Sequence, residues 1–135
     1  MTGARALVAD DNAHLRVWNR RVLEEAGYEV HEAGDGPALE HALETEGPFD
    51  VAVVDVRMPP PTGLRAVAVA RQRGDGTPVV FVTGVNDEDL EATVRQLAPA
   101  ALLIKPFGGD ELLHAVRSVV GTTRRPAVRP GSRSK

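Results

Sequence analysis

Five times along the chain, a short strand-like run is followed by an amphipathic segment of helix length. The runs are residues 6–9, 28–32, 51–54, 79–82 and 101–104, and the helical segments are residues 12–26, 37–46, 63–73, 87–97 and 110–120. Strands that alternate with helices in this way form a parallel sheet with helices on both faces, joined by right-handed crossovers. The chain is therefore predicted to adopt an α/β fold with a doubly wound, five-stranded parallel sheet.

The character of each run predicts its place in the sheet. Residues 28–32 alternate apolar and polar side chains, as a half-exposed edge strand does, whereas residues 51–54 and 79–82 are continuously apolar, which is typical of strands buried on both faces. With residues 28–32 at an edge, the flavodoxin-like strand order 2-1-3-4-5 is the natural arrangement. In segment 12–26, helical spacing predicts that Trp18 belongs to the core.

Composition sets the broad class. The chain has 135 residues, 42% of them hydrophobic and 26% charged, which predicts one domain with its own core. The absence of cysteine excludes disulfides, thiolate zinc sites and thiol nucleophiles. No apolar run approaches the ~20 residues that span a bilayer, and no signal peptide precedes Leu7, so we expect a cytoplasmic protein without membrane contact.

The charge is unevenly spread. Residues 1–120 carry 11 Lys and Arg against 19 Asp and Glu, whereas residues 121–135 carry five basic residues and no acid. The basic end is rich in Pro, Gly, Ser and Thr and lacks aromatic residues, so it is more typical of a solvated segment than of a nucleic-acid-binding surface. We predict a folded domain over residues 1–121 and a basic flexible tail or linker over residues 122–135, without direct nucleic-acid binding.

Polar residues follow four of the predicted strands at their carboxyl ends. They are Asp10, Asp11, Asp55, Thr83 and Lys105. Each has an ordinary structural interpretation by itself, since Asp11 or Asn12 can cap the first helix and a threonine suits a strand end. The carboxyl ends of parallel strands share one edge, however, and ligands bind there at the topological switch point. The coincidence on four strands therefore favours a functional site.

The residue types at this edge indicate phosphoryl chemistry. Two like unit charges ~4 Å apart cost ~4 kcal/mol at an effective dielectric constant of ~20, so clustered carboxylates require a proton or a hard cation among them. Mg²⁺ suits such a site because it prefers oxygen ligands and retains waters. A lysine and a hydroxyl can hold further phosphoryl oxygens, and a carboxylate so surrounded can act as a nucleophile and form an acyl phosphate.

Four groups of residues carry a resemblance to a known family. They are Asp10–Asp11 with Arg16, Asp55 with Met58, Pro59 and Gly63, Thr83–Gly84, and Lys105–Pro106–Phe107. With these motifs, residues 4–121 resemble the receiver domain of two-component response regulators, which would make residues 1–121 a receiver domain. The resemblance implies a phosphorylation-controlled signalling switch that catalyses only its own phosphoryl transfer and dephosphorylation, and is not otherwise an enzyme.

The resemblance also assigns roles to individual residues. Asp55 would be the phosphoacceptor, and Mg²⁺ would be bound by Asp11, Asp55 and the backbone carbonyl of Arg57, with Asp10 acting largely through water. Lys105 would bind a phosphoryl oxygen. The phosphodonor would be a phosphohistidine on a histidine kinase or a histidine phosphotransfer protein, and small donors are also accepted in this family.

Further implied features concern the switch itself. Thr83 would swing its hydroxyl toward the phosphoryl group after transfer, and the Lys105–Pro106 peptide bond would be cis. The signal would pass to an unidentified output protein through the face made by residues 87–97, 101–104 and 110–120.

Three positions depart from the usual family pattern. Leu102 stands three residues before the lysine, where the family usually has Tyr or Phe, so the usual coupled movement of the threonine and the aromatic ring is not expected. Arg57 and Val85 stand two residues after the predicted nucleophile and the threonine, at positions that flank the phosphoryl group in the family. We expect these bulky side chains to slow self-dephosphorylation.

Two other protein classes share part of this pattern but require residues that this chain lacks. A Mg²⁺-dependent phosphatase of the haloacid-dehalogenase type needs a second aspartate two residues after its nucleophile, where this chain has Arg57. A flavodoxin needs a hydroxyl- and glycine-rich phosphate loop where this chain has Asp10–Asp11–Asn12.

For a receiver domain, the sequence leaves three roles open: a stand-alone regulator of a partner, a phosphorelay intermediate, or the N-terminal part of a longer regulator. The 14 residues after Gly121 are too few to fold a DNA-binding domain.

Overall fold

A computed structural model describes residues 3–124 as a five-stranded sheet flanked by five helices. In chain order the elements are β1 (Arg5–Ala9), α1 (Ala13–Glu25), β2 (Glu29–Ala33), α2 (Gly36–Thr45), β3 (Val51–Asp55), α3 (Gly63–Gln72), β4 (Val79–Thr83), α4 (Glu88–Gln96), β5 (Ala100–Ile104) and α5 (Gly109–Arg124). All neighbouring strands are parallel, in the order β2-β1-β3-β4-β5. The predicted fold class and strand order are confirmed.

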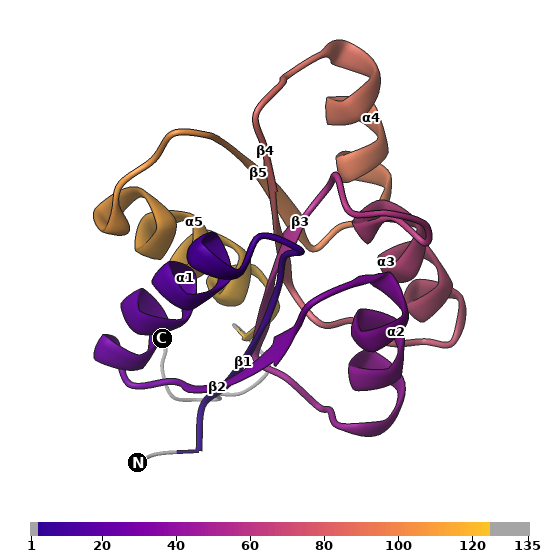
Figure 1. Ribbon diagram of the computed structural model, residues 1–135. Coiled ribbons are helices and arrows are strands. Elements are labelled where there is room, and N and C mark those ends of the chain that lie inside the picture. The colour runs from indigo at the N-terminus through magenta and orange to yellow at the C-terminus, as the bar shows by residue number, and fades with distance from the viewer. Residues whose placement is uncertain (1–2, 125–135) are drawn as a thin grey trace, which may run out of the picture.

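The helices divide between the two faces of the sheet (Figure 1). Helices α1 and α5 cover one face, and α2, α3 and α4 cover the other. Each face has its own apolar cluster, since successive side chains of a strand point to opposite sides. Every residue of β3 and β4 is buried, which explains why their sequences are continuously apolar.

Side-chain caps define where four helices begin. The capping oxygens belong to Asn12, Asp35, Thr62 and Asp87, and each accepts a hydrogen bond from the backbone N–H three residues later. These residues therefore satisfy backbone donors that the first helical turn leaves unpaired. Asn12, and not Asp11, caps α1, so the helix start does not occupy the Asp11 carboxylate.

The prediction that Trp18 lies in the core is wrong. Its side chain is 39% exposed, and the buried residues of α1 are Asn19 and Leu23. Helix α1 is rotated so that the line through Asn19 and Leu23 faces the sheet, while Trp18 lies at the margin of the contact and packs edge-on against Phe107. The helical spacing identified the apolar stripe of α1 but did not show which residues of that stripe would be buried against the sheet.

The last helix extends further than the sequence predicts. Helix α5 continues to Arg124, past residue 120, because Gly121 is not among the glycines with positive φ in the described chain and so does not end the helix. Of the predicted tail, residues 125–135 lie outside the described part of the chain. Between residues 3 and 124, no helix has the length and apolar character needed to cross a membrane.

Candidate functional site

The predicted polar residues meet at the carboxyl edge of the sheet. Asp10 directly follows β1, Asp55 ends β3, Thr83 ends β4, and Lys105 directly follows β5. Because these strands are parallel and adjacent, four segments that are far apart in sequence reach the same edge. The structure therefore brings together the residues that the sequence pattern selected.

Three carboxylates form a cluster at this edge. One oxygen each from Asp10, Asp11 and Asp55 lies within 4.8 Å of the other two, while Asp10 and Asp55 are buried and Asp11 is exposed. Such a cluster has an open side toward solvent through Asp11 and two fixed ligands beneath it. Oxygen donors at this spacing suit a small, hard divalent cation.

Asp10 is the most perturbed member of the cluster. Its Oδ1 accepts a hydrogen bond of 2.9 Å from the backbone N–H of Asn12, while its Oδ2 is buried without a partner. Burial raises the pKa of Asp10 to about 6, the hydrogen bond from Asn12 opposes this, and the nearby Asp55 carboxylate adds to the rise. A buried carboxylate oxygen without a partner is costly, and a cation among the three carboxylates would satisfy it. The residues present therefore fit Mg²⁺.

The Asp55 carboxylate is held at both oxygens. Its Oδ1 accepts a hydrogen bond of 2.9 Å from the backbone N–H of Arg57, and its Oδ2 lies 3.4 Å from Nζ of Lys105. The lysine side chain is 29% exposed, so its ammonium group reaches the buried carboxylate from a partly solvated position. The Lys105–Pro106 peptide bond is cis. This pairing leaves a positively charged group beside the carboxylate that the sequence marked as nucleophile.

Gly63 and Met58 shape the loop that follows Asp55. A Cβ atom at Gly63 would lie 2.4 Å from the carbonyl oxygen of Asp55 and 2.5 Å from Cγ1 of Val54. Glycine is therefore required for α3 to begin so close to the end of β3. Met58 is buried in the cluster beneath α2 and α3, which anchors the loop. Both residues of the motif thus hold the backbone around Asp55 in place.

The remaining predicted residues around this centre differ in their hydrogen bonds and in how far they are buried. The Thr83 hydroxyl donates to the carbonyl oxygen of Val85 (3.0 Å) and accepts from its N–H (3.2 Å), so it is bonded within its own loop. The Val85 side chain is 51% exposed, and Arg57 is exposed as well. Leu102 is half-buried and packs against the cluster on the α4 side of the sheet. Of these four side chains, those of Arg57 and Val85 are therefore exposed, whereas Thr83 is buried and Leu102 contacts the core.

Arg16 supports the Asp10–Asp11 turn from behind. Its Nη1 donates to the carbonyl oxygen of Asp10 (2.7 Å), and its Nε donates to Glu32 on β2 (2.9 Å), which also pairs with Arg20. Burial tends to raise the pKa of Glu32, but hydrogen bonds from the two arginines outweigh it and lower that pKa. Arg16 thereby connects the acidic turn to the β2 edge.

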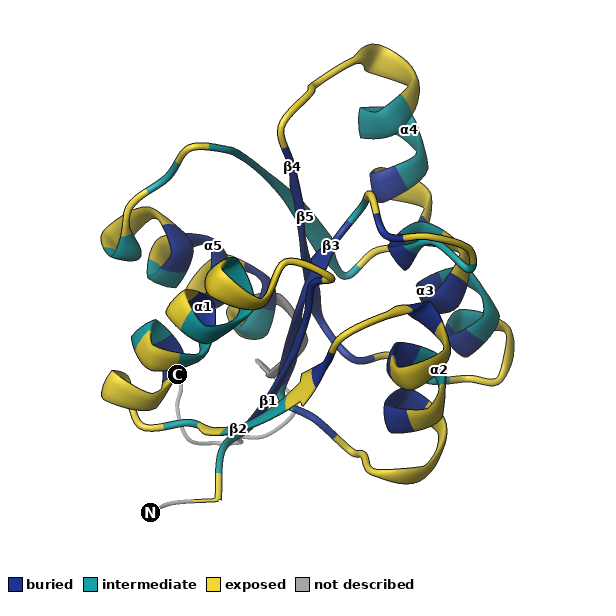
Figure 2. Ribbon diagram, viewed as in Figure 1, coloured by how far each residue is buried: buried dark blue, intermediate teal, exposed yellow. Residues whose placement is uncertain are grey.

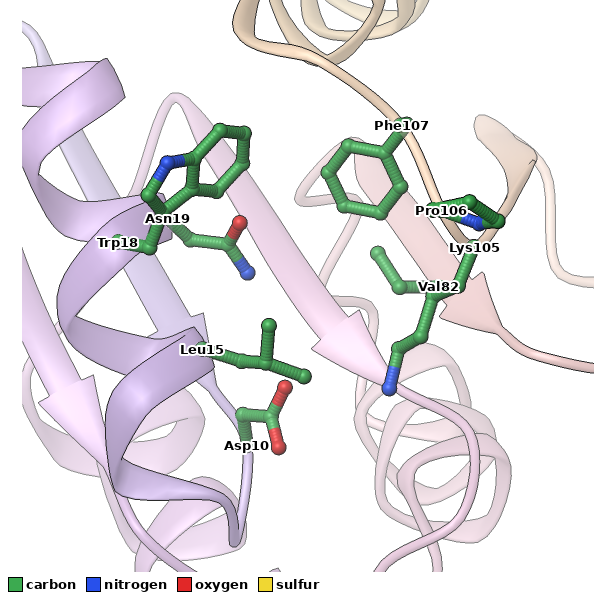
Figure 3. Close-up of a pocket in the computed structure, with 8 residues that line it drawn as sticks. All are labelled: Asp10, Leu15, Trp18, Asn19, Val82, Lys105, Pro106 and Phe107. Carbon is green, nitrogen blue, oxygen red and sulfur yellow. The ribbon is translucent and has the colours of Figure 1, made fainter.

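Sequence reasoning missed one residue beside the site. Asn19 in α1 is 3% exposed, and its Oδ1 is buried without a hydrogen-bond partner. It lines a pocket together with Asp10 and Lys105 (Figure 3). The signal was present in the sequence, since Asn19 lies four residues from both Leu15 and Leu23 and thus on the apolar stripe of the helix.

Comparisons with known proteins agree with this geometry. The chain matches the family model of the response regulator receiver domain over residues 6–117. It is 35% identical over 122 residues to the transcriptional regulatory protein PdtaR of Mycobacterium tuberculosis, covering 89% of this chain and 58% of that protein. It is 32% identical to part of the sensor kinase/phosphatase CqsS of Vibrio cholerae, covering 86% of this chain and 17% of that protein. The chain thus spans little more than half of the first relative and a small part of the second.

Solved structures show the same fold. The chemotaxis protein CheY4 of Vibrio cholerae is 32% identical, with a TM-score of 0.77 over 86% of this chain and 98% of that one. The receiver domain of the Francisella response regulator 1452 is 26% identical, with a TM-score of 0.81 over 90% of this chain and all of that one. The chain therefore belongs to the response regulator receiver domain family, whose members act in phosphorylation-controlled signalling.

Proposed function

We propose that Asp55 is the phosphoacceptor of a phosphorylation-controlled switch. The observation that carries this proposal is the position of its carboxylate, which is buried, lies 3.4 Å from Nζ of Lys105 and shares a cluster with Asp10 and Asp11. A carboxylate beside a fixed ammonium group and a cation site is suited to attack a phosphoryl group and to tolerate the added charge. The buried base of the site also limits access of water from the sheet side.

In the proposed reaction, one carboxylate oxygen of Asp55 attacks the phosphorus of a phosphohistidine donor. The new P–O bond forms as the P–N bond breaks, and the imidazole of the donor leaves with its electron pair. Asp10, Asp11, Asp55 and the backbone carbonyl of Arg57 would hold Mg²⁺, which neutralises charge on the phosphoryl oxygens when bound. Lys105 would pair with one phosphoryl oxygen, since its ammonium group already lies next to the acceptor carboxylate.

Thr83 is the residue proposed to respond to the new group. Its hydroxyl would exchange its hydrogen bonds with the Val85 backbone for one to a phosphoryl oxygen, which would move the loop that leads into α4. Leu102 has no polar group and no ring to report this movement, so we propose that the loop and α4 carry the signal without a coupled aromatic side chain. The output protein would then bind the face formed by α4, β5 and α5.

The proposed switch needs a donor of the phosphoryl group and an output that it regulates. A histidine kinase or a histidine phosphotransfer protein would supply the phosphoryl group. The relatives include a transcriptional regulator and a sensor kinase, each longer than this chain, so the domain can serve different outputs. Regulation of a separate partner is the output we favour, and transfer of the phosphoryl group onward in a phosphorelay is the alternative. A phosphatase of the haloacid-dehalogenase type has no support, since position 57 offers no carboxylic acid.

The test is intact-mass analysis after incubation with Mg²⁺ and acetyl phosphate. Wild type should gain one phosphoryl group, Asp55→Asn should gain none, and chelation of Mg²⁺ by EDTA should prevent the gain. Asp110→Asn, which changes an exposed carboxyl group in the first turn of α5, serves as the matched control and should behave as wild type. A phosphoryl group on the Asp55→Asn protein, or none on wild type with any donor, would refute the assignment.

We also propose that Arg57 and Val85 slow hydrolysis of the acyl phosphate. Both side chains are exposed, and the backbone of each is hydrogen-bonded to a site residue, Asp55 or Thr83. They therefore flank the route by which water would reach the phosphoryl group. The half-life of the phosphorylated protein should shorten several-fold in Arg57→Ala and in Val85→Ala, and stay unchanged in Arg65→Ala, an exposed control on α3. Unchanged half-lives in the first two variants would contradict the proposal.

A further inference from the structure

A pocket of about 350 Å³ lies between α1 and the segment that follows β5 (Figure 3). Eight residues line it: Asp10, Leu15, Trp18, Asn19, Val82, Lys105, Pro106 and Phe107. Its volume is near the lower limit for small-molecule sites, which are concave and mostly apolar with a few polar groups. The phosphoryl-transfer proposal uses only Asp10 and Lys105 of this set, and most of the lining has no role in it.

The two ends of the pocket differ in chemistry. The rings of Trp18 and Phe107 pack edge-on at one end, with centroids 5.8 Å apart and planes inclined by 61°. Asp10 and the ammonium group of Lys105 lie at the other end, and Leu15 and Val82 form apolar walls between them. The aromatic end suits a flat ring, because aromatic groups pack well edge-on or offset against one another.

Asn19 supplies a polar group within the apolar part. Asn19 is 3% exposed, and its Oδ1 is buried without a hydrogen-bond partner. Figure 3 shows the amide between Trp18 and Leu15, directed into the pocket. Buried amides almost always have partners, so an unpaired one in a pocket points to a ligand that bonds it. The amide can offer either its N–H or its oxygen after a flip.

The charges at the far end select against charged ligands. Lys105 is already paired with Asp55, and the neighbouring groups are the carboxylates of Asp10 and Asp11. An anion would be repelled by these carboxylates, and a cation would be drawn past the pocket to the carboxylate cluster itself. A neutral molecule avoids both effects.

We propose that this pocket binds a small neutral aromatic or heteroaromatic molecule that carries an amide or hydroxyl group. The ring lies between Leu15, Val82 and the Trp18–Phe107 pair, and the polar group hydrogen-bonds to the amide of Asn19. Asp55 does not line the pocket, so binding can be measured in the Asp55→Asn protein, which lacks the proposed phosphoacceptor. The site would thus add a ligand input to a domain whose other proposed input is a phosphoryl group.

The probe is oxindole, a neutral bicyclic lactam, titrated into ¹⁵N-labelled protein and followed by NMR. Trp18 is the only tryptophan in the chain, so its indole N–H gives one assignable signal beside the pocket. Saturable shifts are expected at this signal and at the amides of Asn19 and Phe107. Absence of saturation, or shifts centred elsewhere on the protein, would overturn the proposal and leave the pocket as a water-filled space.

Variants separate a ligand role of Asn19 from a structural one. Asn19→Leu should fold at least as stably, because it removes an unpaired buried polar group, and should weaken oxindole binding about 2- to 10-fold, as expected for one lost hydrogen bond. Asn86→Leu, the same substitution at an exposed loop position, should leave the affinity unchanged. If Asn19→Leu does not fold, Phe107→Ala takes its place and should also weaken binding. Equal affinity in wild type and the folded variant would refute the proposal.

Discussion

The centre of the sheet and its β5–α4 side are built differently. All residues of β3 and β4 are buried, whereas every residue of β5 is only partly buried and Val94 is the one buried residue of α4 (Figure 2). The first turn of α4 is acidic and exposed. Both regions contribute to the same site, since the centre ends in Asp55 and Thr83 and the outer side supplies Lys105.

This difference matches the roles proposed for the residues. The carboxylate that must keep its position for phosphoryl transfer stands on a strand without exposed residues, next to a glycine that permits close packing. Thr83 itself is buried at the end of β4, but the loop that follows it and α4, which are proposed to move, have few buried residues. Such segments open and shift at a lower free-energy cost than the core. The site thus combines a fixed acceptor with an adjustable surround.

The largest expected effect compares two residues that are neighbours across β4 and β5. Phe81 and Leu102 are paired in register, and Phe81 is fully buried whereas Leu102 is half-buried. Phe81→Ala should lower the free energy of unfolding by about 3–5 kcal/mol, because it leaves a cavity in the core. Leu102→Ala should lower it by only about 1 kcal/mol, since less apolar area is lost. Urea unfolding measures both, and equal losses would remove the contrast between the two regions.

Gly63 tests how tightly the centre is packed around the acceptor. Gly63→Ala places a Cβ atom 2.4 Å from the carbonyl oxygen of Asp55, so the backbone must shift. We expect a loss of about 3 kcal/mol in unfolding free energy, at the upper end for overpacking, together with slower phosphorylation. Gly84→Ala, where a Cβ atom meets nothing within 4 Å, is the control and should change stability by less than about 0.5 kcal/mol.

Arg71 tests how α4 and β5 are held to the rest of the fold. Few residues are buried there, and hydrogen bonds from the Arg71 side chain contribute in place of apolar packing. Its guanidinium donates to the carbonyl oxygens of Leu97 (2.9 Å), Asp75 (3.0 Å) and Pro99 (3.2 Å), and so ties α3 to the end of α4 and the start of β5. Arg71→Met should lower the unfolding free energy by about 2 kcal/mol.

Two further variants of this part of α3 serve as controls for the anchor. Arg71→Lys should restore only part of the loss, since an ammonium group cannot reproduce the planar fork of donors. Arg73→Met changes an exposed arginine nearby and should alter stability by less than about 0.5 kcal/mol. If Arg71→Met and Arg73→Met unfold at the same denaturant concentration, the anchor has no energetic role.

The smallest effect is expected at the opposite edge, where Glu32 pairs with Arg16 and Arg20. The pKa of Glu32 is lowered below its ordinary value of 4.5, so the pairing stabilises the fold above that pH and is lost as the pH falls through the folded-state pKa. Glu32→Gln should cost about 0.5–1 kcal/mol at neutral pH, because solvent screens exposed pairs.

The pH dependence provides the check on this pair. The difference in stability between wild type and Glu32→Gln should be constant near neutrality and shrink on acidification below 4.5. Glu44→Gln changes an exposed glutamate on α2 and should show no such difference. A gap that persists unchanged in acid would indicate a packing effect instead of an ion pair.

Much of the site could be predicted because parallel topology converts sequence order into position. Once the apolar runs are recognised as strands, Asp10, Asp55, Thr83 and Lys105 each fall at a carboxyl end, and these ends share one edge. Asp55 and Lys105 are 50 residues apart in sequence, and their 3.4 Å contact follows from that rule and not from any local pattern. The strand order followed in the same way from the alternating pattern of residues 28–32.

The sequence alone determined the order of elements, the doubly wound sheet and the polar residues at its carboxyl edge, because these depend on periodicity and on chain direction. Only the tertiary structure decided which side of α1 is covered, since that depends on how the β5–α5 segment packs over it. Trp18 consequently lies at the margin beside Phe107, and Asn19 occupies the buried position. It also decided that Asn12 caps α1 and that Asp11 lies near Asp10 and Asp55, because by sequence either residue could have capped the helix.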